Sequence, residues 1–166
     1  MRIQIPSLLL LAVCSVWIAQ AHADPDVPEP FHEYRGKVVL VDFWASWCGP
    51  CLRSFPWLNR MQAEYADRGL VVLGVNLDKN RADADVFIEK LQPRFKILYD
   101  DSASLAHQFG VETMPSSFVL DARGEVVMEH RGFTTKRAPE FERKILIVLE
   151  NHRAQFNDTG KEIHRP

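Results

Sequence analysis

The chain has 166 residues, of which 46% are hydrophobic, and its formal net charge at pH 7 is −2. This length fits one globular domain with a core of its own. The near-neutral charge gives no electrostatic reason to expect nucleic acid as a partner. The absence of an internal repeat or a long low-complexity tract argues against a repeat protein or a disordered one.

The first 23 residues have the pattern of a secretory signal peptide. Arg2 supplies the positive charge of a short n-region, and residues 8–19 form an apolar stretch about the length of an h-region. Ala21-His22-Ala23 resembles an A-x-A signal-peptidase cleavage site. We therefore expect cleavage after Ala23 and a periplasmic or otherwise exported protein.

Two other interpretations of the N-terminus stay open. Residues 5–21 could remain as a membrane anchor, although the stretch is short for a span of about 20 residues. Cys14 could be the modified residue of a lipoprotein, but Val13 precedes it where a small residue is expected. We expect contact with the membrane only if this segment is retained.

The remaining chain predicts a linker at residues 24–36, which is acidic and rich in proline, one domain at residues 37–151 and a flexible tail at residues 152–166. Apolar periodicity and turn residues predict strands at 37–44, 70–76, 95–99, 116–120 and 125–130, and helices at 48–65, 84–91, 102–109 and 139–151. The third helix is expected to be capped by Asp101 or Ser102. This alternation predicts an α/β fold in which a sheet is flanked by helices.

The pentapeptide Trp47-Cys48-Gly49-Pro50-Cys51 directly follows the first predicted strand. A strand that leads into C-x-x-C at a helix start is typical of a redox-active dithiol. Cys48 is expected at the helix N-terminus, where free N–H groups favour a thiolate. Gly49 allows close backbone approach, and Pro50 suits the first helical turn.

Two other interpretations of the cysteines are weaker. A structural zinc site needs four ligands, whereas the chain has three cysteines and no histidine pair at ligand spacing. A purely structural disulfide does not require the sequence Trp-Cys-Gly-Pro-Cys or a position between a strand and a helix. We therefore predict no metal site.

The segment from Val41 to Cys51, with Pro56 five residues later, resembles thioredoxin. Met114-Pro115-Ser116 before an apolar strand is similar to the family's cis-proline loop. The export signal and the extra helix and strand between about residues 83 and 99 resemble the exported TlpA-like branch. The resemblance implies a thioredoxin fold with a central mixed sheet and an inserted helix–strand segment.

The resemblance also implies roles for individual residues. Cys48 would be the attacking thiol and Cys51 the resolving thiol, with Asp42 as the buried acid that assists proton transfer at Cys51. Pro115 would be cis, and Met114 would offer backbone hydrogen bonds to an extended client segment. Trp47, Gly49 and Pro50 would flank the site.

One departure concerns a second acid. Some TlpA-like proteins carry a second acidic residue shortly after the strand that ends here at Asn76. In this chain the residues near that position are Asp78 and Lys79. That difference leaves client recognition open.

The expected activity is reduction of client disulfides, with no cofactor besides the Cys48–Cys51 pair. Gly-Pro between the cysteines matches thioredoxin, whose potential is about −270 mV, rather than the oxidant DsbA at about −120 mV. The resemblance implies a role in cytochrome c maturation or redox homeostasis, with a membrane thiol protein as electron donor. The alternatives are a disulfide oxidase or isomerase, a copper-binding assembly protein, and a binding or chaperone role. A peroxidase is set aside because Ala45 stands where it needs Thr or Ser.

Overall fold

The computed structural model describes residues 29–162, with side chains as far as residue 154. The predicted signal peptide and Cys14 lie outside the described residues. The elements are η1 (Phe31–Tyr34), β1 (Val38–Trp44), α1 (Cys51–Tyr65), η2 (Ala66–Arg68), β2 (Leu70–Asn76), α2 (Arg81–Leu91), β3 (Lys96–Tyr99), α3 (Ser104–Gln108), β4 (Ser116–Leu120), β5 (Val126–Arg131) and α4 (Ala138–Glu162). The predicted order of strands and helices is confirmed.

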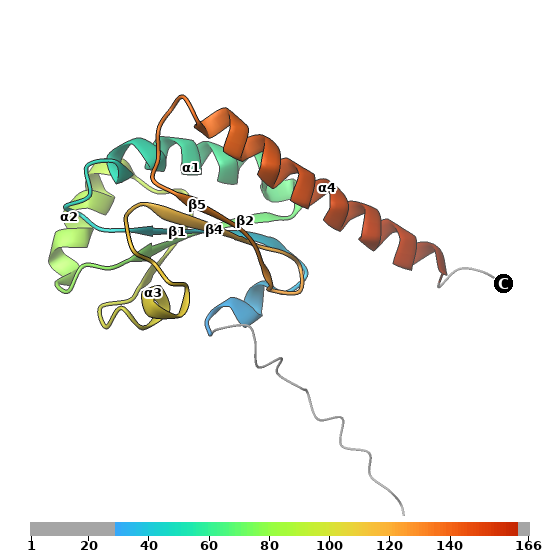
Figure 1. Cartoon of the computed structure of the whole chain (residues 1–166), viewed down its shortest axis with the longest axis horizontal. Helices are drawn as coiled ribbons and strands as arrows, with labels where there is room; N and C mark the ends of the chain where they lie inside the picture. The colour runs from blue at the N-terminus through green and yellow to red at the C-terminus, as the bar shows by residue number, and fades with distance from the viewer. Residues whose placement is uncertain (1–28, 163–166) are drawn as a thin grey trace, which may run out of the picture.

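The five strands form one mixed sheet in the order β3-β2-β1-β4-β5 (Figure 1). β1 and β2 are parallel, as are β2 and β3, whereas β4 runs antiparallel to both β1 and β5. All seven residues of the central strand β1 are buried. A strand covered on both faces reads as an unbroken apolar run, which is why the sequence identified it so clearly.

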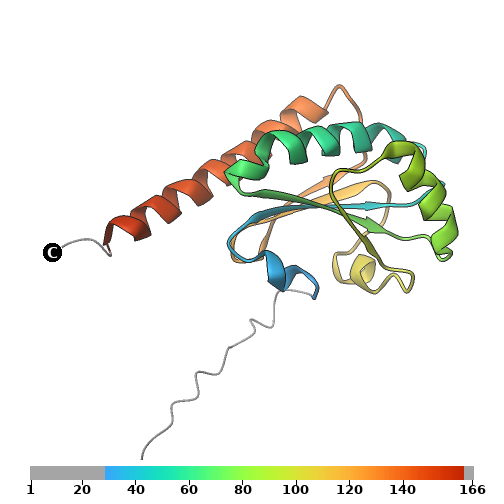
Figure 2. The ribbon, with the colours of Figure 1, turned by 180° about the vertical axis from the view of Figure 1, so that it is seen from behind.

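Helices cover both faces of the sheet, with α1 and α4 on one side and η1 and α3 on the other (Figures 1 and 2). Successive side chains of a strand point to opposite faces. Leu40 and Trp44 therefore belong to the core cluster that includes residues of α1, α2 and α4, and Phe43 belongs to the cluster on the α3 side. Asp42 shares the face of Leu40 and Trp44. The predicted α/β fold with a mixed sheet and an inserted α2–β3 segment is confirmed.

The start of α1 differs from the prediction. The helix begins at Cys51 rather than Cys48, and Pro50 is its N-cap residue. The three preceding residues form turns instead, because the N–H of Cys48 donates to the carbonyl of Ala45 at 3.0 Å and that of Cys51 to the carbonyl of Cys48 at 3.0 Å. Cys48 therefore precedes the helix rather than belonging to it.

The predicted cap of α3 is also wrong. The helix begins at Ser104, preceded by Ala103 with a left-handed φ of 57°, and no side chain caps it at that residue. Asp100 takes the role instead, since its Oδ2 accepts the backbone N–H of Ala106 at 2.9 Å. A carboxylate that accepts a free N–H of a helix's first turn has the same effect as an N-cap.

The two ends of the predicted domain both shift outwards. Phe31 lies in the predicted linker but is only 2% exposed, and its ring packs against Phe109 with centroids 5.5 Å apart. At the other end α4 continues to Glu162, so residues 152–162 of the predicted tail are helical. No proline interrupts those residues, and proline is the strongest stop signal for a helix.

Among residues 29–162, no helix is both long enough and apolar enough to cross a membrane.

Candidate active site

The two cysteines form a disulfide in the link between β1 and α1. The sulfurs are 2.02 Å apart and the Cα atoms 5.3 Å apart. Cys51 is fully buried and Cys48 is 4% exposed, so Cys48 is the more accessible of the two cysteines. The backbone N–H of Cys51 donates to Cys48 Sγ at 3.2 Å. Although Cys48 is not helical, its sulfur therefore shares the first N–H of α1 with the Cys48 carbonyl, and an N–H donor at a helix start favours a thiolate.

Apolar side chains are exposed on either side of Cys48. Trp47 is 71% exposed and Leu52 38% exposed, while Gly49 is exposed and Pro50 half-buried. A Cβ added at Gly49 would meet open space. Large exposed apolar side chains beside a reactive group are typical of a binding surface.

Asp42 is a buried acid on the face of the sheet that carries both cysteines in its core cluster. It is 1% exposed, and Ser117 Oγ donates to its Oδ1 at 2.6 Å. Burial raises the pKa of the Asp42 carboxyl to about 7, against the smaller opposing effect of the Ser117 hydrogen bond. Such a group can accept and release a proton near neutral pH.

The loop before β4 lies at the same end of the sheet as the end of β1. The Met114–Pro115 peptide bond is cis, as the resemblance implied. Met114 packs against the core cluster that contains Cys48 and Cys51. The backbone N–H of Gly132 donates to the carbonyl of Pro115 at 2.7 Å, which ties the loop to the end of β5. The structure thus brings Trp47, the two cysteines, Asp42 and the cis-proline loop to one end of the sheet.

Sequence reasoning missed a buried polar network behind Trp47. Asp78 is 6% exposed, and its carboxylate accepts hydrogen bonds from the Ser46 N–H at 2.8 Å, the Ser46 hydroxyl at 2.8 Å and the Asn76 amide at 2.7 Å. The only available signal was an acid just after a buried strand. Because parallel strands end at the same sheet edge, that position lies beside the end of β1.

Ser117 was also missed. It reads as one of two small polar residues at the start of a strand, and only the register of β4 against β1, which pairs Ser117 with Asp42, reveals its partner.

The other two tryptophans near the site are core residues. Trp44 is fully buried, and Trp57 is 7% exposed with its ring stacked on Phe141 at 5.5 Å. The indole N–H of Trp57 donates to Glu142 Oε2 at 3.4 Å, which links α1 to α4.

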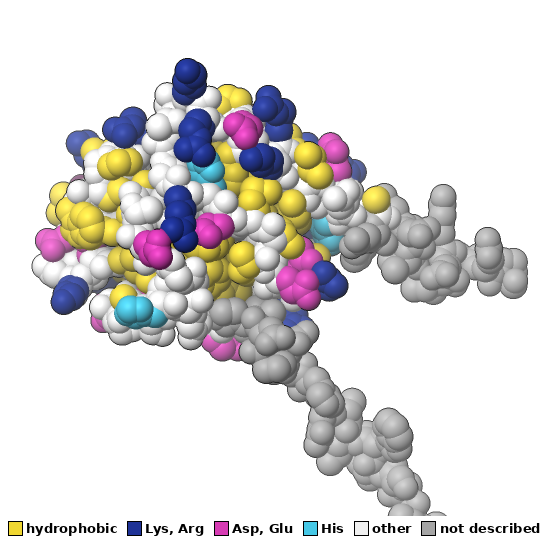
Figure 3. Space-filling view, in the orientation of Figure 1, with side chains coloured by type: hydrophobic (Ala, Val, Ile, Leu, Met, Phe, Trp, Pro, Cys, Tyr) yellow, Lys and Arg dark blue, Asp and Glu magenta, His cyan; other side chains and the backbone are white. Residues whose placement is uncertain are grey.

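Cations gather over the upper part of the face in Figure 3, above α1 and the start of α4. Lys136 and Arg137, just before α4, and Arg143 and Lys144, on α4, are exposed. The ring of His130 on β5 stacks on Phe141 of α4 at 4.3 Å. Burial lowers the pKa of His130, and Arg137 and Lys144 lower it further.

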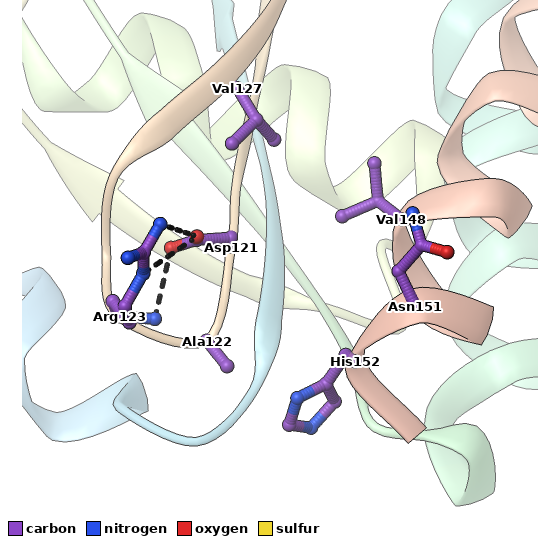
Figure 4. A pocket seen from close by; sticks show the side chains of 7 residues that line it. All are labelled: Asp121, Ala122, Arg123, Val127, Val148, Asn151 and His152. Atoms are coloured by element: carbon purple, nitrogen blue, oxygen red, sulfur yellow. Dashed lines mark hydrogen bonds and ion pairs between the residues drawn. The ribbon is translucent and has the colours of Figure 1, made fainter. Parts of the chain in front are cut away.

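A cavity of about 360 Å³ lies between the β4–β5 turn and α4 (Figure 4). Asp121, Arg123, Val148 and His152 are among its lining residues, and Arg123 donates to Asp121 within the turn at 3.2 Å. None of the site residues predicted from the sequence lines it. Across the described part of the chain, no group of three or more Cys, His, Asp or Glu residues is placed to hold a metal ion.

Comparison with known proteins gives a consistent answer. The family model described as Redoxin matches residues 23–145. The thiol-disulfide oxidoreductase ResA of Geobacillus thermodenitrificans is 33% identical over 104 residues, which are 63% of this chain and 60% of ResA. ResA of Bacillus anthracis is 28% identical over 108 residues, 65% of this chain and 62% of that protein. The chain thus spans about three fifths of the length of these curated relatives.

Solved structures extend the likeness. A protein of Chlorobium tepidum with the provisional name thiol:disulfide interchange protein DsbE is 42% identical, with a TM-score of 0.69 over 70% of this chain and 83% of that one. StoA of Bacillus subtilis is 26% identical, with a TM-score of 0.58 over 66% of this chain and 82% of StoA. The thioredoxin-like, TlpA-like resemblance seen in the sequence is thereby confirmed, and the chain belongs to the Redoxin family.

Proposed function

We propose that the protein is an exported thiol-disulfide oxidoreductase that reduces disulfide bonds in client proteins. The observation that carries this proposal is the Cys48–Cys51 disulfide at the β1–α1 junction, with the buried acid Asp42 on the same face of the sheet. The names of the relatives, thiol-disulfide oxidoreductase and thiol:disulfide interchange protein, support it.

In the proposed reaction the reduced pair begins as two thiols. The Cys48 thiolate attacks one sulfur of a client disulfide, and the other client sulfur leaves as a thiolate. Cys51 then attacks Cys48, which forms the intramolecular disulfide and releases the second client thiolate. Cys48 suits the first role because it is the less buried cysteine and its sulfur accepts the N–H of Cys51.

Asp42 is proposed as the base of the second step. Cys51 must lose its proton before it attacks, and full burial leaves its sulfur without water as acceptor. A carboxyl with a pKa near 7 is half ionised at neutral pH. It can therefore take the thiol proton and later return it, which is the requirement for a general acid–base group.

Client binding is assigned to the residues around Cys48, of which Trp47 and Gly49 are exposed. Trp47, Gly49 and Pro50 form one side of this surface, and Met114 and Pro115 form the other. Backbone groups of the Met114–Pro115 loop would pair with an extended client segment, the mode of recognition in which a strand is added to an existing edge. Exposed Trp47 would supply apolar contact area.

The proposal includes a supply of electrons and a location. A dithiol that works as a reductant in an oxidising compartment needs a reduced donor, and a membrane thiol protein would provide it. The expected location is the periplasm after cleavage behind Ala23, with anchoring by residues 5–21 as the alternative. The disulfide itself would be the only redox group, and cytochrome c maturation or redox homeostasis the setting.

The second candidate is a disulfide oxidase or isomerase. It uses the same residues, and the word "interchange" in the name of the Chlorobium relative leaves the direction of electron flow open. A copper-binding role gains no support from the described residues, which hold no cluster suited to a metal.

The deciding experiment is the reduction potential of the Cys48–Cys51 pair, measured by equilibrating the purified protein with glutathione or dithiothreitol. A value near the thioredoxin potential of about −270 mV supports the reductase, and one near the DsbA potential of about −120 mV supports the oxidase.

Cysteine variants test the order of attack. Cys51→Ser is expected to accumulate a mixed disulfide with a disulfide-containing peptide, because the resolving thiol is missing. Cys48→Ser is the matched control and should trap nothing. Equal trapping by the two variants would contradict the assignment, and turnover by either variant would rule out the dithiol mechanism.

A further inference from the structure

Ser117 is the hydrogen-bonding partner of the buried acid. It lies on β4, directly opposite Asp42 on β1, and is itself 4% exposed. Its hydroxyl donates to Asp42 Oδ1 at 2.6 Å, whereas Asp42 Oδ2 is buried and has no hydrogen-bond partner among the described residues. The two oxygens of this carboxyl are therefore not equivalent.

The neighbours of this pair explain why one oxygen is left free. On β2 the residue opposite Asp42 is Gly74, which has no side chain to offer. On β5 the residue opposite Ser117 is His130, whose ring stacks on Phe141 of α4. The charged groups that act on His130 are Arg137, Lys144 and Glu140. On the helix side, the core cluster of this face contains Cys51.

We propose that Ser117 is a positioning residue for the second thiol exchange: its hydroxyl holds Oδ1 of Asp42, so that Oδ2 is turned towards Cys51 and receives the thiol proton. This inference rests on the proposed function. A buried carboxylate that accepts one strong hydrogen bond keeps a defined orientation, because rotation would break a charge-assisted bond that nothing else replaces.

The step balances as follows. The proton of the Cys51 thiol moves to Asp42 Oδ2, and the electron pair left on sulfur forms the Cys51–Cys48 bond. The bond between Cys48 and the client sulfur breaks, and the client leaves as a thiolate that takes a proton from water. The client disulfide gains the two electrons that the Cys48–Cys51 dithiol loses.

Removing the hydroxyl has a predictable direction. A hydrogen bond to the charged form of a carboxyl favours that form, so its loss in Ser117→Ala raises the pKa of Asp42 above its value of about 7. Less carboxylate is then present at pH 7. A rise of one pKa unit would lower the carboxylate fraction at pH 7 from about a half to about a tenth, and the resolution step would slow with it.

The test uses three variants of the full protein. Ser117→Ala removes the hydroxyl, and Ser117→Thr keeps it. Ser116→Ala is the matched control for the titration, because Ser116 is the adjacent buried residue of β4 and its hydroxyl donates to the Thr113 carbonyl at 2.8 Å instead of to Asp42. The Asp42 carboxyl is followed by carbon NMR in the reduced protein from pH 4 to pH 10. Attack and resolution rates on an uncharged disulfide peptide are measured separately by single-turnover kinetics.

We expect the Asp42 titration and the pH profile of resolution to move upwards together in Ser117→Ala. At pH 7 the ratio of resolution rate to attack rate should fall severalfold, and Ser117→Thr should restore it. The titration in Ser116→Ala should match the wild type.

An unchanged titration in Ser117→Ala, or an equal shift in Ser116→Ala, overturns the positioning role. A shifted titration without a change in the resolution profile overturns it too, since Asp42 would then not be the base. If the wild type fails to reduce the peptide at all, the proposed function fails. The NMR titration alone then decides whether Ser117 controls Asp42.

Discussion

Asp78 holds Ser46 with both oxygens of its carboxylate. Oδ2 accepts the backbone N–H of Ser46 and Oδ1 its hydroxyl, each at 2.8 Å. Asn76, the last residue of β2, donates its amide to Oδ2 at 2.7 Å and accepts the backbone N–H of Asp78 at 3.2 Å. The turn that leads from β1 to Trp47 and Cys48 is thus attached to the end of β2.

Replacing Asp78 by Asn should destabilise the protein and loosen this turn. An amide has one acceptor oxygen, so at least one donor of Ser46 loses its partner, at a cost of about 1–3 kcal/mol. Chemical denaturation measures the change in unfolding free energy, and hydrogen exchange measures protection of the Ser46 amide. Asp100→Asn is the control, since it removes a comparable buried acceptor at the start of α3. Both variants should lose stability, but only Asp78→Asn should lose protection at Ser46.

Gly74→Ala tests how tightly β2 packs against the side chains of its neighbouring strands. A Cβ at this position would lie 2.9 Å from Ile97 Cδ1, 2.9 Å from Phe95 Cε2 and 3.1 Å from Trp44 Nε1. Overpacking of this kind costs about 1–3 kcal/mol. At Gly49 a Cβ meets nothing within 4 Å, so Gly49→Ala should change stability by about 0.5 kcal/mol or less. Equal thermal stability of the two variants would contradict the packing described here.

Glu142 should make the protein sensitive to acid. Its side chain is 14% exposed and pairs with Arg60, and Tyr65 donates to it at 2.7 Å. The hydrogen bond from Arg60 lowers the pKa of Glu142 to about 2, although burial opposes the shift. An acid with a depressed pKa stabilises the folded state above its unfolded pKa, and this contribution disappears as pH falls from about 4.5 towards 2.

Glu142→Gln should therefore flatten the fall in unfolding free energy across that window, measured by urea denaturation at several pH values. Glu64→Gln is the control, because Glu64 also pairs with Arg60 but is 47% exposed. Its slope should stay close to that of the wild type, since exposed pairs contribute little.

Asp42 should have the opposite dependence. Burial raises its pKa from 3.8 to about 7, so the unfolded chain ionises first and stability falls as pH rises between these values. At pH 8 the shift corresponds to about 4 kcal/mol. Asp42→Asn should remove this cost and raise the unfolding free energy at pH 8 far more than at pH 4. A gain that does not depend on pH would show that ionisation of Asp42 is not its origin.

Much of this protein could be predicted from the sequence, because the signals are local. The apolar run of β1 identifies a doubly covered strand, and Trp47-Cys48-Gly49-Pro50-Cys51 with Met114-Pro115 identifies the site and the family. The errors occur where local signals are weak. The ends of a helix depend on which groups hydrogen-bond its terminal N–H and C=O groups. Neighbouring residues therefore did not reveal that Asp100 caps the start of α3 or that α4 continues to Glu162.

The partners of the site residues depend on the fold. Asp42 and Ser117 are 75 residues apart in the chain, and Ser46 and Asp78 are 32 apart. Sheet order and register bring each pair together. Burial then strengthens their hydrogen bonds, because no water competes for the donors and acceptors. The residues alone show that a dithiol follows a buried strand. Which oxygen of Asp42 accepts a hydrogen bond and which has none follows only from the fold, because the donor lies on β4, a strand distant in sequence that pairs with β1.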